Sequence, residues 1–310
     1  MGHDTIKFID SSPLDRLGAQ NDRNKGNKMF NYLIKRAEMV IEALPYLRKF
    51  RKKIIVIKYG GAAMVDEDIK DKVMQDIALL NLVGMHPVVI HGGGKEITQV
   101  LEKKKIKSSF IKGMRQTSEE AIAVVSKVLA KVNRKIVEQI KQHGGRATAF
   151  TSQSKLIKAR KLVMEGIDLG YVGDVDGIKK SRIYKTLKDW KVPVITSVGT
   201  GKNGKRYNIN ADAAAAAIAS ILNAKKLIFM TDVRGVLDDK GRLITSINSK
   251  KISSLIKRKV ISGGMIPKAN YGLSAIKAGV EKVHIIDGRI PHALLLEIFT
   301  NSGIGTMIQK

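Results

Sequence analysis

A run of alanines in the second half of the chain constrains the fold more than any other stretch. Residues Ala213 to Ala217 follow Asn208-Ile209-Asn210-Ala211-Asp212 and lead towards a short apolar segment, residues 227–231. Because alanine is the strongest helix former, we expect a helix to begin near Asn210. The apolar segment predicts a buried strand that ends before Asp232. This order of loop, helix, strand and loop is typical of open α/β sheets, which bind anionic ligands beside such helix starts.

The first half of the chain contains a lysine and two glycines at the end of a predicted strand. Residues Ile54 to Ile57 are all apolar and predict a buried strand, and Lys58, Gly60 and Gly61 follow them. Glycines at this place let backbone amides approach an oxyanion closely. A helix over about Asp66 to Val83 is expected next, because its apolar residues recur at helical spacing.

A second glycine loop follows the next predicted strand, Pro87 to Ile90. It reads His91-Gly92-Gly93-Gly94-Lys95-Glu96. Glu96 after Lys95 excludes a Walker A loop, and Ile97 stands where a dinucleotide fingerprint needs a third glycine. What remains is a loop whose backbone amides could surround a phosphoryl group. His91 alone is more often a packed histidine than a catalyst.

Arg115 stands just before a long predicted helix. Thr117 and Glu120 fit a capping box for this helix, which extends to Gly144. An arginine fixed before a helix start is well placed to grip a carboxylate through two bonds. A third glycine segment, Ser262 to Lys268, places Lys268 in the first turn of another helix, where a positive charge opposes the helix dipole. Packing therefore explains Lys268 poorly.

The N-terminal region divides into two parts by composition. Residues 1–28 have few large apolar side chains and predict a flexible tail. Residues 29–49 carry apolar side chains at helical spacing and predict an amphipathic helix with a bend at Pro45. Such a helix could pack on the core or dock on another subunit. The apolar stripe that includes Phe30 and Leu33 would be unusual on the surface of a monomer.

The chain carries a net charge of +28 and contains no cysteine, which excludes disulfides and thiolate chemistry. A basic balance can indicate nucleic acid, an anionic membrane or acidic small molecules. The lysines are spread along nearly every predicted helix, and only 5% of the residues are aromatic, so we expect no specific nucleic acid. No apolar run reaches the length of a membrane span, and the N-terminus lacks the apolar core of a secretion signal, so we expect a soluble, cytoplasmic protein without a membrane partner.

The motifs taken together, in their order and spacing, resemble those of the N-acetylglutamate kinases of the amino acid kinase family. The resemblance covers roughly residue 29 to the C-terminus. One segment departs from the usual pattern, Ala149 to Ser154, where Gly-Leu-Ser-Gly-Lys-Asp is usual. The segments that carry the resemblance are Lys58-Tyr59-Gly60-Gly61, His91-Gly92-Gly93-Gly94, Gly113-Met114-Arg115, Asn208-Ile209-Asn210-Ala211-Asp212, Thr231-Asp232-Val233-Arg234-Gly235-Val236 and Gly263-Gly264-Met265-Ile266-Pro267-Lys268.

The resemblance implies an α/β fold in which an open, mainly parallel sheet lies between two layers of helices, with an N-terminal helical extension. Residues 50–199 would hold the acyl-amino-acid acceptor and residues 200–310 would hold ATP, within one continuous kinase domain. The implied reaction is the ATP-dependent phosphorylation of the side-chain carboxylate of N-acetyl-L-glutamate, a step of arginine biosynthesis. Mg²⁺ would be carried by the nucleotide, with no metal bound by the protein itself.

The resemblance also implies roles for individual residues. Lys58 and Lys268 would neutralise the moving phosphoryl group, and Asp212 would hold both ammonium groups, although a helix cap would also explain Asp212. Arg115 would grip the α-carboxylate of the acceptor, and Asn208 would contact its amide. Further acceptor contacts are implied for Gly60, Gly61, Gly92, Gly93, Gly94 and Asn210, and nucleotide contacts for Thr231, Asp232, Gly235, Val236, Gly263 and Met265.

The N-terminal helix and the segment Val283 to Glu297 resemble the branch of N-acetylglutamate kinases that is inhibited by arginine. In that branch three dimers form a hexameric ring, and the N-terminal helix interlaces between dimers. The resemblance implies that arginine is a feedback inhibitor. Glu281, Glu297 and the loops at Gly288 and Gly303 could supply the carboxylate and carbonyl partners that its guanidinium needs. The implied arginine site comprises Tyr32, Glu281, His284, Gly288, Glu297 and Gly303. Deletion of the residues before Lys49 is expected to give dimers that are active but indifferent to arginine.

Two alternatives remain open from the sequence. The chain could be another carboxylate kinase of the same family, acting on glutamate or aspartate. It could also be a basic regulatory or nucleic-acid-binding protein that kept the fold and lost activity. The pairing of Arg115 with Asn208 argues against the first alternative, because it suits an acceptor with a carboxylate and an amide. The presence of Lys58, Asp212 and Lys268 together argues against the second.

Overall fold

The structure, a computed structural model, describes residues 16–64, 66–111, 113–164, 166–301 and 303–310, and the chain divides into two compact units, residues 1–45 and 46–310. The smaller unit contains helix α1 (Arg16–Glu42), and a turn at Ala43 separates α1 from α2 (Leu44–Phe50). The helix therefore begins earlier than the expected Met29, and it ends close to the expected bend at Pro45. Residues 1–15 of the predicted tail lie outside the described residues. No helix in the described part of the chain is both long and apolar enough to cross a membrane.

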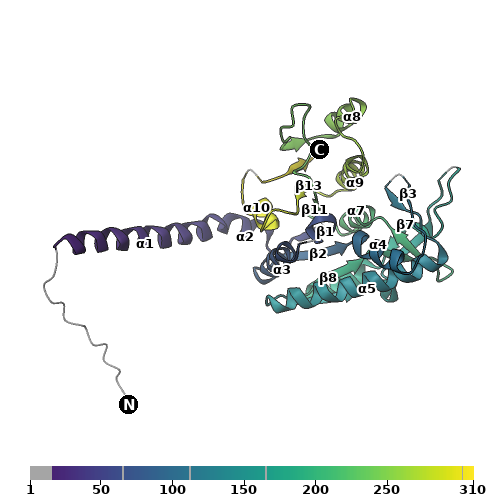
Figure 1. Ribbon diagram of the computed structural model, residues 1–310, viewed down its shortest axis with the longest axis horizontal. Coiled ribbons are helices and arrows are strands. Elements are labelled where there is room, and N and C mark those ends of the chain that lie inside the picture. Colours follow the sequence, from purple (N-terminus) through teal and green to yellow (C-terminus); the bar gives the residue numbers. More distant parts are fainter. Residues whose placement is uncertain (1–15, 65, 112, 165, 302) are drawn as a thin grey trace, which may run out of the picture. The chain divides into compact units, whose positions relative to one another are not determined.

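The larger unit is built on an eight-stranded sheet in the order β12-β14-β13-β11-β1-β2-β8-β5. Figure 1 shows β13, β11, β1, β2 and β8 side by side in that order. Neighbours from β13 to β5 are parallel, and β14 runs antiparallel to its neighbour β13. The predicted mainly parallel sheet is confirmed. The strands are β1 (Ile54–Tyr59), β2 (His86–His91), β5 (Ala147–Phe150), β8 (Val192–Thr196), β11 (Lys226–Thr231), β12 (Ser246–Ile247), β13 (Lys282–Asp287) and β14 (Thr306–Ile308).

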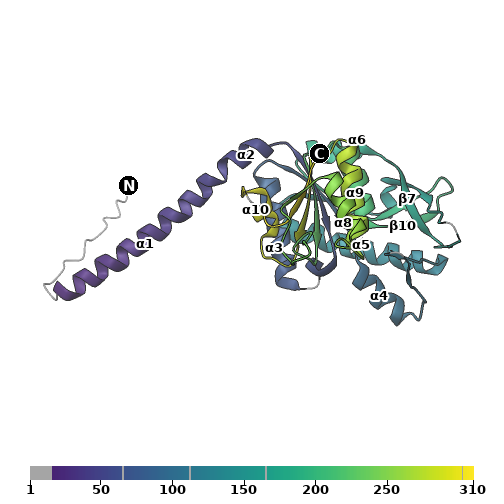
Figure 2. The ribbon, with the colours of Figure 1, turned by 90° about the horizontal axis from the view of Figure 1, so that it is seen from above.

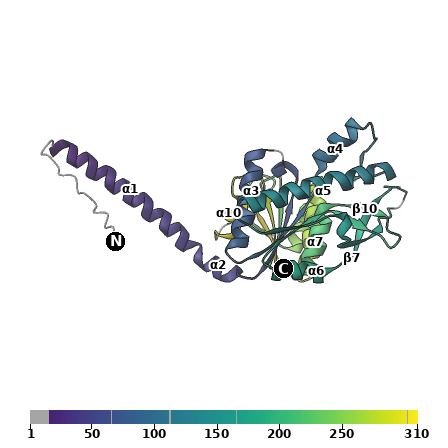
Figure 3. The same ribbon diagram turned by 90° about the horizontal axis from the view of Figure 1, so that it is seen from below.

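Alternate residues of the strands enter two separate cores. On β1, Val56 belongs to one core, and Ile55 and Ile57 belong to the other, as the period of two in a strand requires. Figure 2 shows α8 and α9 on one side of the sheet and α3 and α10 on the other, and Figure 3 shows α6 and α7 opposite α3 and α5. The first layer contains α6 (Lys180–Lys188), α7 (Ala211–Ile221), α8 (Ser249–Lys257) and α9 (Met265–Lys277), and the second contains α3 (Glu67–Leu82), α5 (Glu119–Gln142) and α10 (Ala293–Ile298).

Smaller elements are added at the carboxyl edge of β1 and β2 and beside α5. A short 3-10 helix, η1 (Gly61–Met64), follows β1, and α4 (Gly94–Lys103) follows β2 and packs on α5 through Leu101 and Leu129. The hairpin of β3 (Phe110–Ile111) and β4 (Met114–Arg115) precedes α5. A second 3-10 helix and a small closed barrel complete the unit: η2 (Ser152–Ser154), β6 (Ile157–Lys161), β7 (Val172–Ile178), β9 (Val198–Thr200) and β10 (Arg206–Ile209).

The start of α5 corrects one prediction. Ser118, and not Thr117, caps this helix, because the Ser118 hydroxyl accepts the amide of Ala121 at 3.1 Å. The hydroxyl of Thr117 instead donates to the carbonyl of Arg115 at 2.7 Å. Thr117 is fully buried, so its hydroxyl fixes the chain that leaves β4 rather than the helix that follows. Ala121 and not a glutamate stands three residues after Ser118, so a single serine cap replaces the predicted capping box.

Candidate active site

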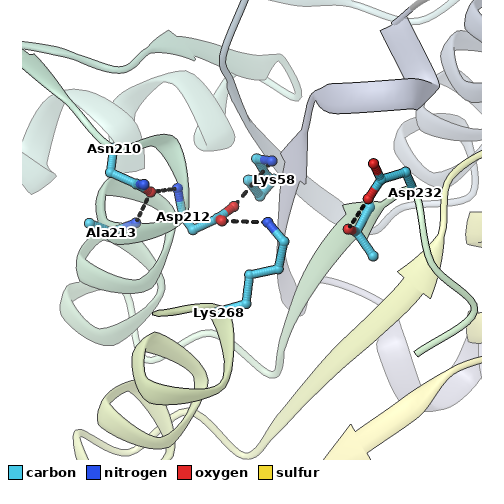
Figure 4. Close-up of polar contacts among 7 residues, drawn as sticks. Lys58, Asn210, Asp212, Ala213, Asp232 and Lys268 are labelled. Carbon is cyan, nitrogen blue, oxygen red and sulfur yellow. Dashed lines mark hydrogen bonds and ion pairs between the residues drawn. The ribbon is translucent and has the colours of Figure 1, made fainter. Parts of the chain in front are cut away.

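Three charged side chains from three different elements meet at the carboxyl edge of the sheet. Lys58 lies on β1, Asp212 lies in the first turn of α7, and Lys268 lies in the first turn of α9 (Figure 4). The Lys58 Nζ is 3.1 Å from Asp212 Oδ1, and the Lys268 Nζ is 2.6 Å from Asp212 Oδ2. Each carboxylate oxygen therefore faces one ammonium group. The predicted cluster of Lys58, Asp212 and Lys268 is present.

Asn210 caps the helix that carries Asp212. Its Oδ1 accepts the amides of Asp212 at 2.8 Å and of Ala213 at 3.3 Å. An asparagine at this position satisfies amides that the helix leaves unpaired. The alternative in which Asp212 is the cap is wrong, because its carboxylate faces the two lysines. Asn210 also lines the cavity described below, so its side chain has a structural role in addition to any contact with a ligand.

Burial and charge compete within this cluster. Burial acts to raise the pKa of Asp212, but the positive charges of Lys58 and Lys268 more than offset it, and the pKa lies below its ordinary value. Burial lowers the pKa of Lys58, and the charge of Asp212 only partly restores it. Asp212 is therefore ionised and paired with both lysines. Lys58 holds its proton less firmly than an ordinary lysine does.

A cavity of about 590 Å³ lies beside the cluster. All the residues predicted to contact the acceptor line it, together with Lys58 and Asp212. Its volume is within the range of small-ligand sites in proteins. The acceptor residues at its wall are Gly60, Gly61, Gly92, Gly93, Gly94, Arg115, Asn208 and Asn210. Residues 149–154, which depart from the usual pattern, are not among the lining residues.

Not every amide of the second glycine loop is available to a ligand. The amide of Gly92 donates to the carbonyl of Tyr59 at 3.2 Å, so it continues the pairing of β1 and β2. The expectation that Gly92 offers its amide to a ligand is therefore wrong in this structure. Gly93 stands at the N-terminus of α4, where no side-chain cap is present among the described residues. The first amides of a helix have no partner within the helix, so the amides at this end can face an anion.

Arg115 is buried and held by several groups. Its Nη2 donates to the carbonyl of Gly94 at 2.9 Å and to the hydroxyl of Thr98 at 2.6 Å, and its Nη1 donates to the hydroxyl of Ser108 at 3.2 Å. The guanidinium also lies over the ring of Phe110, 4.5 Å from its centroid. These bonds use N–H donors of Arg115 that would be needed to bind a carboxylate through two parallel hydrogen bonds. A carboxylate would therefore have to replace at least one of them.

Thr117 links the two residues that were predicted to recognise the acceptor. Its hydroxyl donates to the carbonyl of Arg115, and it accepts from the Nδ2 of Asn208 at 3.2 Å. Thr98, Ser108, Phe110 and Thr117 were not identified from the sequence as part of the site. Hydroxyl and phenyl side chains occur throughout the sequence, so nothing in it marks these four residues. Only the fold brings them close to Arg115 or Asn208.

The residues predicted to bind the nucleotide lie outside this cavity. Figure 4 shows Asp232 and Asn210 on opposite sides of Lys58 and Lys268, and Thr231 donates to the carboxylate of Asp232 at 3.2 Å. Gly263 has φ +53°, and Met265 begins α9. Gly235, with φ +141°, approaches Thr306 so closely that a Cβ would lie 2.6 Å from its Oγ1. Val236 is buried in the core, and its amide donates to Thr306 at 2.8 Å, so it supports the loop.

A second, smaller cavity of about 180 Å³ contains four of the six residues predicted to bind arginine: Glu281, His284, Glu297 and Gly303. Buried Glu297 pairs with the Nδ1 of His284 and accepts the amide of Ile304 at 2.8 Å. Gly288 does not line this cavity. Its amide donates to the carbonyl of Thr231 at 2.8 Å, and a Cβ at this position would lie 2.8 Å from the Cβ of Ala63. Tyr32 belongs to the smaller unit, on α1, where Arg36 covers its ring.

The described residues contain no group of three or more histidine, aspartate or glutamate side chains that could hold a metal ion. The carboxylate at the centre of the main site is occupied by two lysines. This donor set suits a metal that enters with phosphate groups better than one held by the protein.

Comparisons with known proteins find related sequences over most of the chain. Residues 53–287 match the model of the amino acid kinase family. The chain is 50% identical over 290 residues to an acetylglutamate kinase of Ruthia magnifica subsp. Calyptogena magnifica, covering 91% of this chain and 98% of that protein. It is 45% identical over 294 residues to an acetylglutamate kinase of Aquifex aeolicus, covering 90% and 99%.

A solved structure extends the likeness to the fold. The N-acetylglutamate synthase of Neisseria gonorrhoeae, in complex with coenzyme A and N-acetyl-glutamate, superposes with a TM-score of 0.81 at 24% identity, over 88% of this chain and 63% of that one. The present chain thus spans less than two thirds of the synthase, and the likeness concerns the fold alone. The family match covers most of the chain, and both curated relatives match nearly end to end. The chain therefore belongs to the amino acid kinase family.

Proposed function

We propose that the protein transfers the γ-phosphoryl group of ATP to the side-chain carboxylate of N-acetyl-L-glutamate, giving N-acetylglutamyl 5-phosphate and ADP. The observation that carries the proposal is the pair of lysines, Lys58 and Lys268, fixed by one buried carboxylate beside a cavity that contains Arg115 and Asn208. The two curated relatives are both named acetylglutamate kinase, which supports the same reaction.

The chemistry needs positioning and charge neutralisation rather than a base. The acceptor carboxylate is already ionised at neutral pH, so its oxygen can attack phosphorus directly while the bond from phosphorus to the ADP oxygen breaks. Negative charge on the moving group is met by the ammonium groups of Lys58 and Lys268. Because Asp212 holds both lysines before the reaction, little reorganisation is needed in the transition state.

The acceptor would lie in the larger cavity with its two ends recognised by different groups. The guanidinium of Arg115 would bind the α-carboxylate after exchanging a bond to Thr98 or Ser108. Asn208 would contact the acetamido group, because an amide side chain can both donate and accept. Its present bond to Thr117 uses one of its donors.

The nucleotide would lie on the other side of the lysines, near Thr231, Asp232 and the start of α9. Mg²⁺ bound to the phosphates would neutralise part of their charge. The loop at Gly263 and Gly264, directly before α9, would approach the phosphate oxygens, because glycines leave the backbone open there. The first amides of α9 would not, since Met265 and Ile266 already donate to the carbonyls of Ser262 and Gly263.

Trapping of the product tests the proposed reaction. Hydroxylamine converts an acyl phosphate into a hydroxamate, which gives a coloured iron complex, whereas a phosphate ester does not react. We expect hydroxamate to form with ATP, Mg²⁺ and N-acetyl-L-glutamate in equal amount to ADP. ADP without hydroxamate would mean that the acceptor is not a carboxylate, and the proposal would fail.

We also propose that free arginine inhibits the enzyme by binding in the smaller cavity. Glu281 and Glu297 would offer carboxylates for a guanidinium after exchanging their present contacts with Lys225 and His284. Lys49, Lys226 and Lys282 would offer positive charge for the α-carboxylate of the same molecule. Burial lowers the pKa of Lys226 to about 8 despite the nearby charge of Glu297, so an added carboxylate would stabilise its charged form. The assembly proposed with this inhibition is a hexamer, built as three dimers through α1.

A further inference from the structure

A buried polar pair lies beneath the second glycine loop and has no part in the proposed chemistry. His91, the last residue of β2, and Asn133, in the middle of α5, are both fully buried. The Nε2 of His91 lies 3.0 Å from the Nδ2 of Asn133, and the Nδ1 of His91 lies 2.8 Å from the carbonyl oxygen of Gly92. The expectation that His91 is a packed histidine is correct. Both of its ring nitrogens have a specific hydrogen-bond partner.

The hydrogen bonds determine which nitrogen of His91 carries the proton. The Nδ2 of Asn133 also donates to the carbonyl of Val194 at 2.9 Å, which fixes the orientation of the amide. An amide nitrogen can only donate, so the Nε2 of His91 must accept and the proton must be on Nδ1. Burial lowers the pKa of His91 to about 4, so the ring is neutral near pH 7. The Nδ1–H therefore donates to the carbonyl of Gly92.

This bond fixes the orientation of one peptide group at the wall of the cavity. The chain has no cis peptide among the described residues, and in a trans peptide the N–H points opposite to the C=O. With the Gly92 carbonyl held towards His91 and α5, the amide of Gly93 must point away from them. His91 does not line the cavity, whereas Gly92 and Gly93 do. A Cβ on Gly93 would lie 2.8 Å from the Leu129 side chain, so α5 also restricts this position to glycine.

We propose that His91 and Asn133 are positioning residues that hold the Gly92–Gly93 peptide with the Gly93 amide directed at the phosphoryl group in flight. The proposal rests on the proposed phosphoryl transfer, and it assigns to Gly93 the donor that Gly92 cannot supply. The amide of Gly92 is already bonded to Tyr59, so the flip of a single peptide would remove the remaining donor of this pair. A fixed donor of this kind acts mainly in the transition state, so its loss lowers kcat more than it raises KM.

Two substitutions of His91 separate the two hydrogen bonds. In His91→Asn the amide nitrogen takes the place of Nδ1, so the bond to the Gly92 carbonyl is retained and the bond to Asn133 is lost. In His91→Gln the side-chain amide oxygen takes the place of Nε2 and accepts from the Nδ2 of Asn133, so the bond to Asn133 is retained and the bond to the Gly92 carbonyl is lost. Both variants replace a buried ring by a smaller amide. A purely structural role therefore predicts similar losses in the two, while the proposed role predicts that His91→Gln is worse in kcat.

The experiment compares wild type, His91→Asn and His91→Gln in kcat, in KM for each substrate and in thermal unfolding. We expect His91→Gln to lower kcat roughly 100-fold, with both KM values within about twofold, and His91→Asn to recover most of the loss. Tight binding of ADP with aluminium fluoride and N-acetyl-L-glutamate should weaken in parallel with kcat, while ATP binding stays unchanged.

The outcomes distinguish the two proposals. A wild-type enzyme without activity on N-acetyl-L-glutamate refutes the proposed function. An active wild type with equal kcat losses in the two variants, or with changes confined to KM, refutes only the role of His91. If circular dichroism shows His91→Gln to be unfolded, Asn133→Ala tests the same peptide from the other side. A drop of about tenfold in kcat at constant KM would then support the proposal, and an unchanged kcat would overturn it.

Discussion

The two lysines of the site are expected to act at the same stage of the reaction. Lys58→Ala or Lys268→Ala should each lower kcat roughly 100- to 1,000-fold, because each removes a charge that matters most when the phosphoryl group is in transit. The dissociation constant of ATP should change far less. Initial rates and calorimetric titration with a non-hydrolysable ATP analogue measure the two quantities. A variant that keeps near wild-type turnover would remove that lysine from the proposed role.

Asp212 sets the pH range in which Lys58 is charged. The pKa of Lys58 is already below the ordinary lysine value because of burial, and Asp212 is the main group that raises it again. The reaction needs the charged lysine, so activity should fall as the pH rises through this lowered pKa. In Asp212→Asn the negative charge that raises the pKa of Lys58 is removed. The pKa of Lys58 should fall further, and the basic limb of the pH profile of kcat should move to lower pH. An unmoved basic limb, or the loss of an acidic limb instead, would point to a base role for Asp212.

The sequence was sufficient to identify the residues of the site whose chemistry is rare at their position. A lysine in the first turn of a helix, Lys268, and glycines after buried strands are unusual. In the fold, Lys268 pairs with Asp212, and the glycines line the cavity beside that carboxylate. Thr98 and Ser108 could not be found in this way, because hydroxyls are frequent on helices and loops. Asn133 could not be identified as a partner of His91 either. The sequence of α5 does not indicate which of its polar residues faces the end of β2. Only the packing of α5 on the sheet reveals its partner.

At the scale of elements, most helices and strands followed from apolar periodicity and glycine stops. The strand of β1, for example, was predicted over Ile54 to Ile57 and extends to Tyr59. Helix starts were less certain, since several neighbouring residues can cap. At α5 both Thr117 and Ser118 have a suitable hydroxyl, and the fold decides between them because Thr117 is buried against Arg115 and Asn208.

The start of α5 gives a matched pair of variants. Ser118→Ala removes the helix cap and should lower the free energy of unfolding by about 1 kcal/mol, with kcat and KM unchanged. Thr117→Val keeps the shape but removes the hydroxyl that joins Arg115 to Asn208, so it should raise KM for the acceptor and leave KM for ATP unchanged. Urea unfolding and steady-state kinetics on both variants test this. If Ser118→Ala raised KM for the acceptor and Thr117→Val did not, Ser118 and not Thr117 would be the residue that supports acceptor binding.

At the scale of the molecule, the apolar residues of α1 need a partner. Met29, Phe30 and Val40 are all at least 65% exposed, which is a large apolar surface for a single helix. A helix with such a surface needs either the chain's own core or another subunit as its partner. The proposed hexamer supplies the second kind of partner. The net charge of +28 does not favour self-association, so the contact would depend on this apolar surface.

Deletion of residues 1–43 removes α1 and keeps α2, whose Phe50 is buried in the core. We expect the shortened protein to form dimers instead of hexamers, to keep most of its kcat, and to lose inhibition by arginine. Light scattering and activity against millimolar arginine measure these properties. An unchanged mass after deletion, or a full-length enzyme that arginine does not inhibit, would contradict the proposed assembly and regulation.

The choice of acceptor is the most direct test of the central proposal. Release of ADP is followed in a coupled assay with N-acetyl-L-glutamate, L-glutamate or L-aspartate at matched concentrations, with ATP and Mg²⁺ in excess. The site predicts that kcat/KM for N-acetyl-L-glutamate exceeds that for the other two acceptors by about 100-fold. The reason is that Asn208 and its neighbours favour the acetamido group of N-acetyl-L-glutamate over the charged ammonium group of the free amino acids. Equal or faster ADP release with L-glutamate or L-aspartate, or none with any of the three, would contradict it.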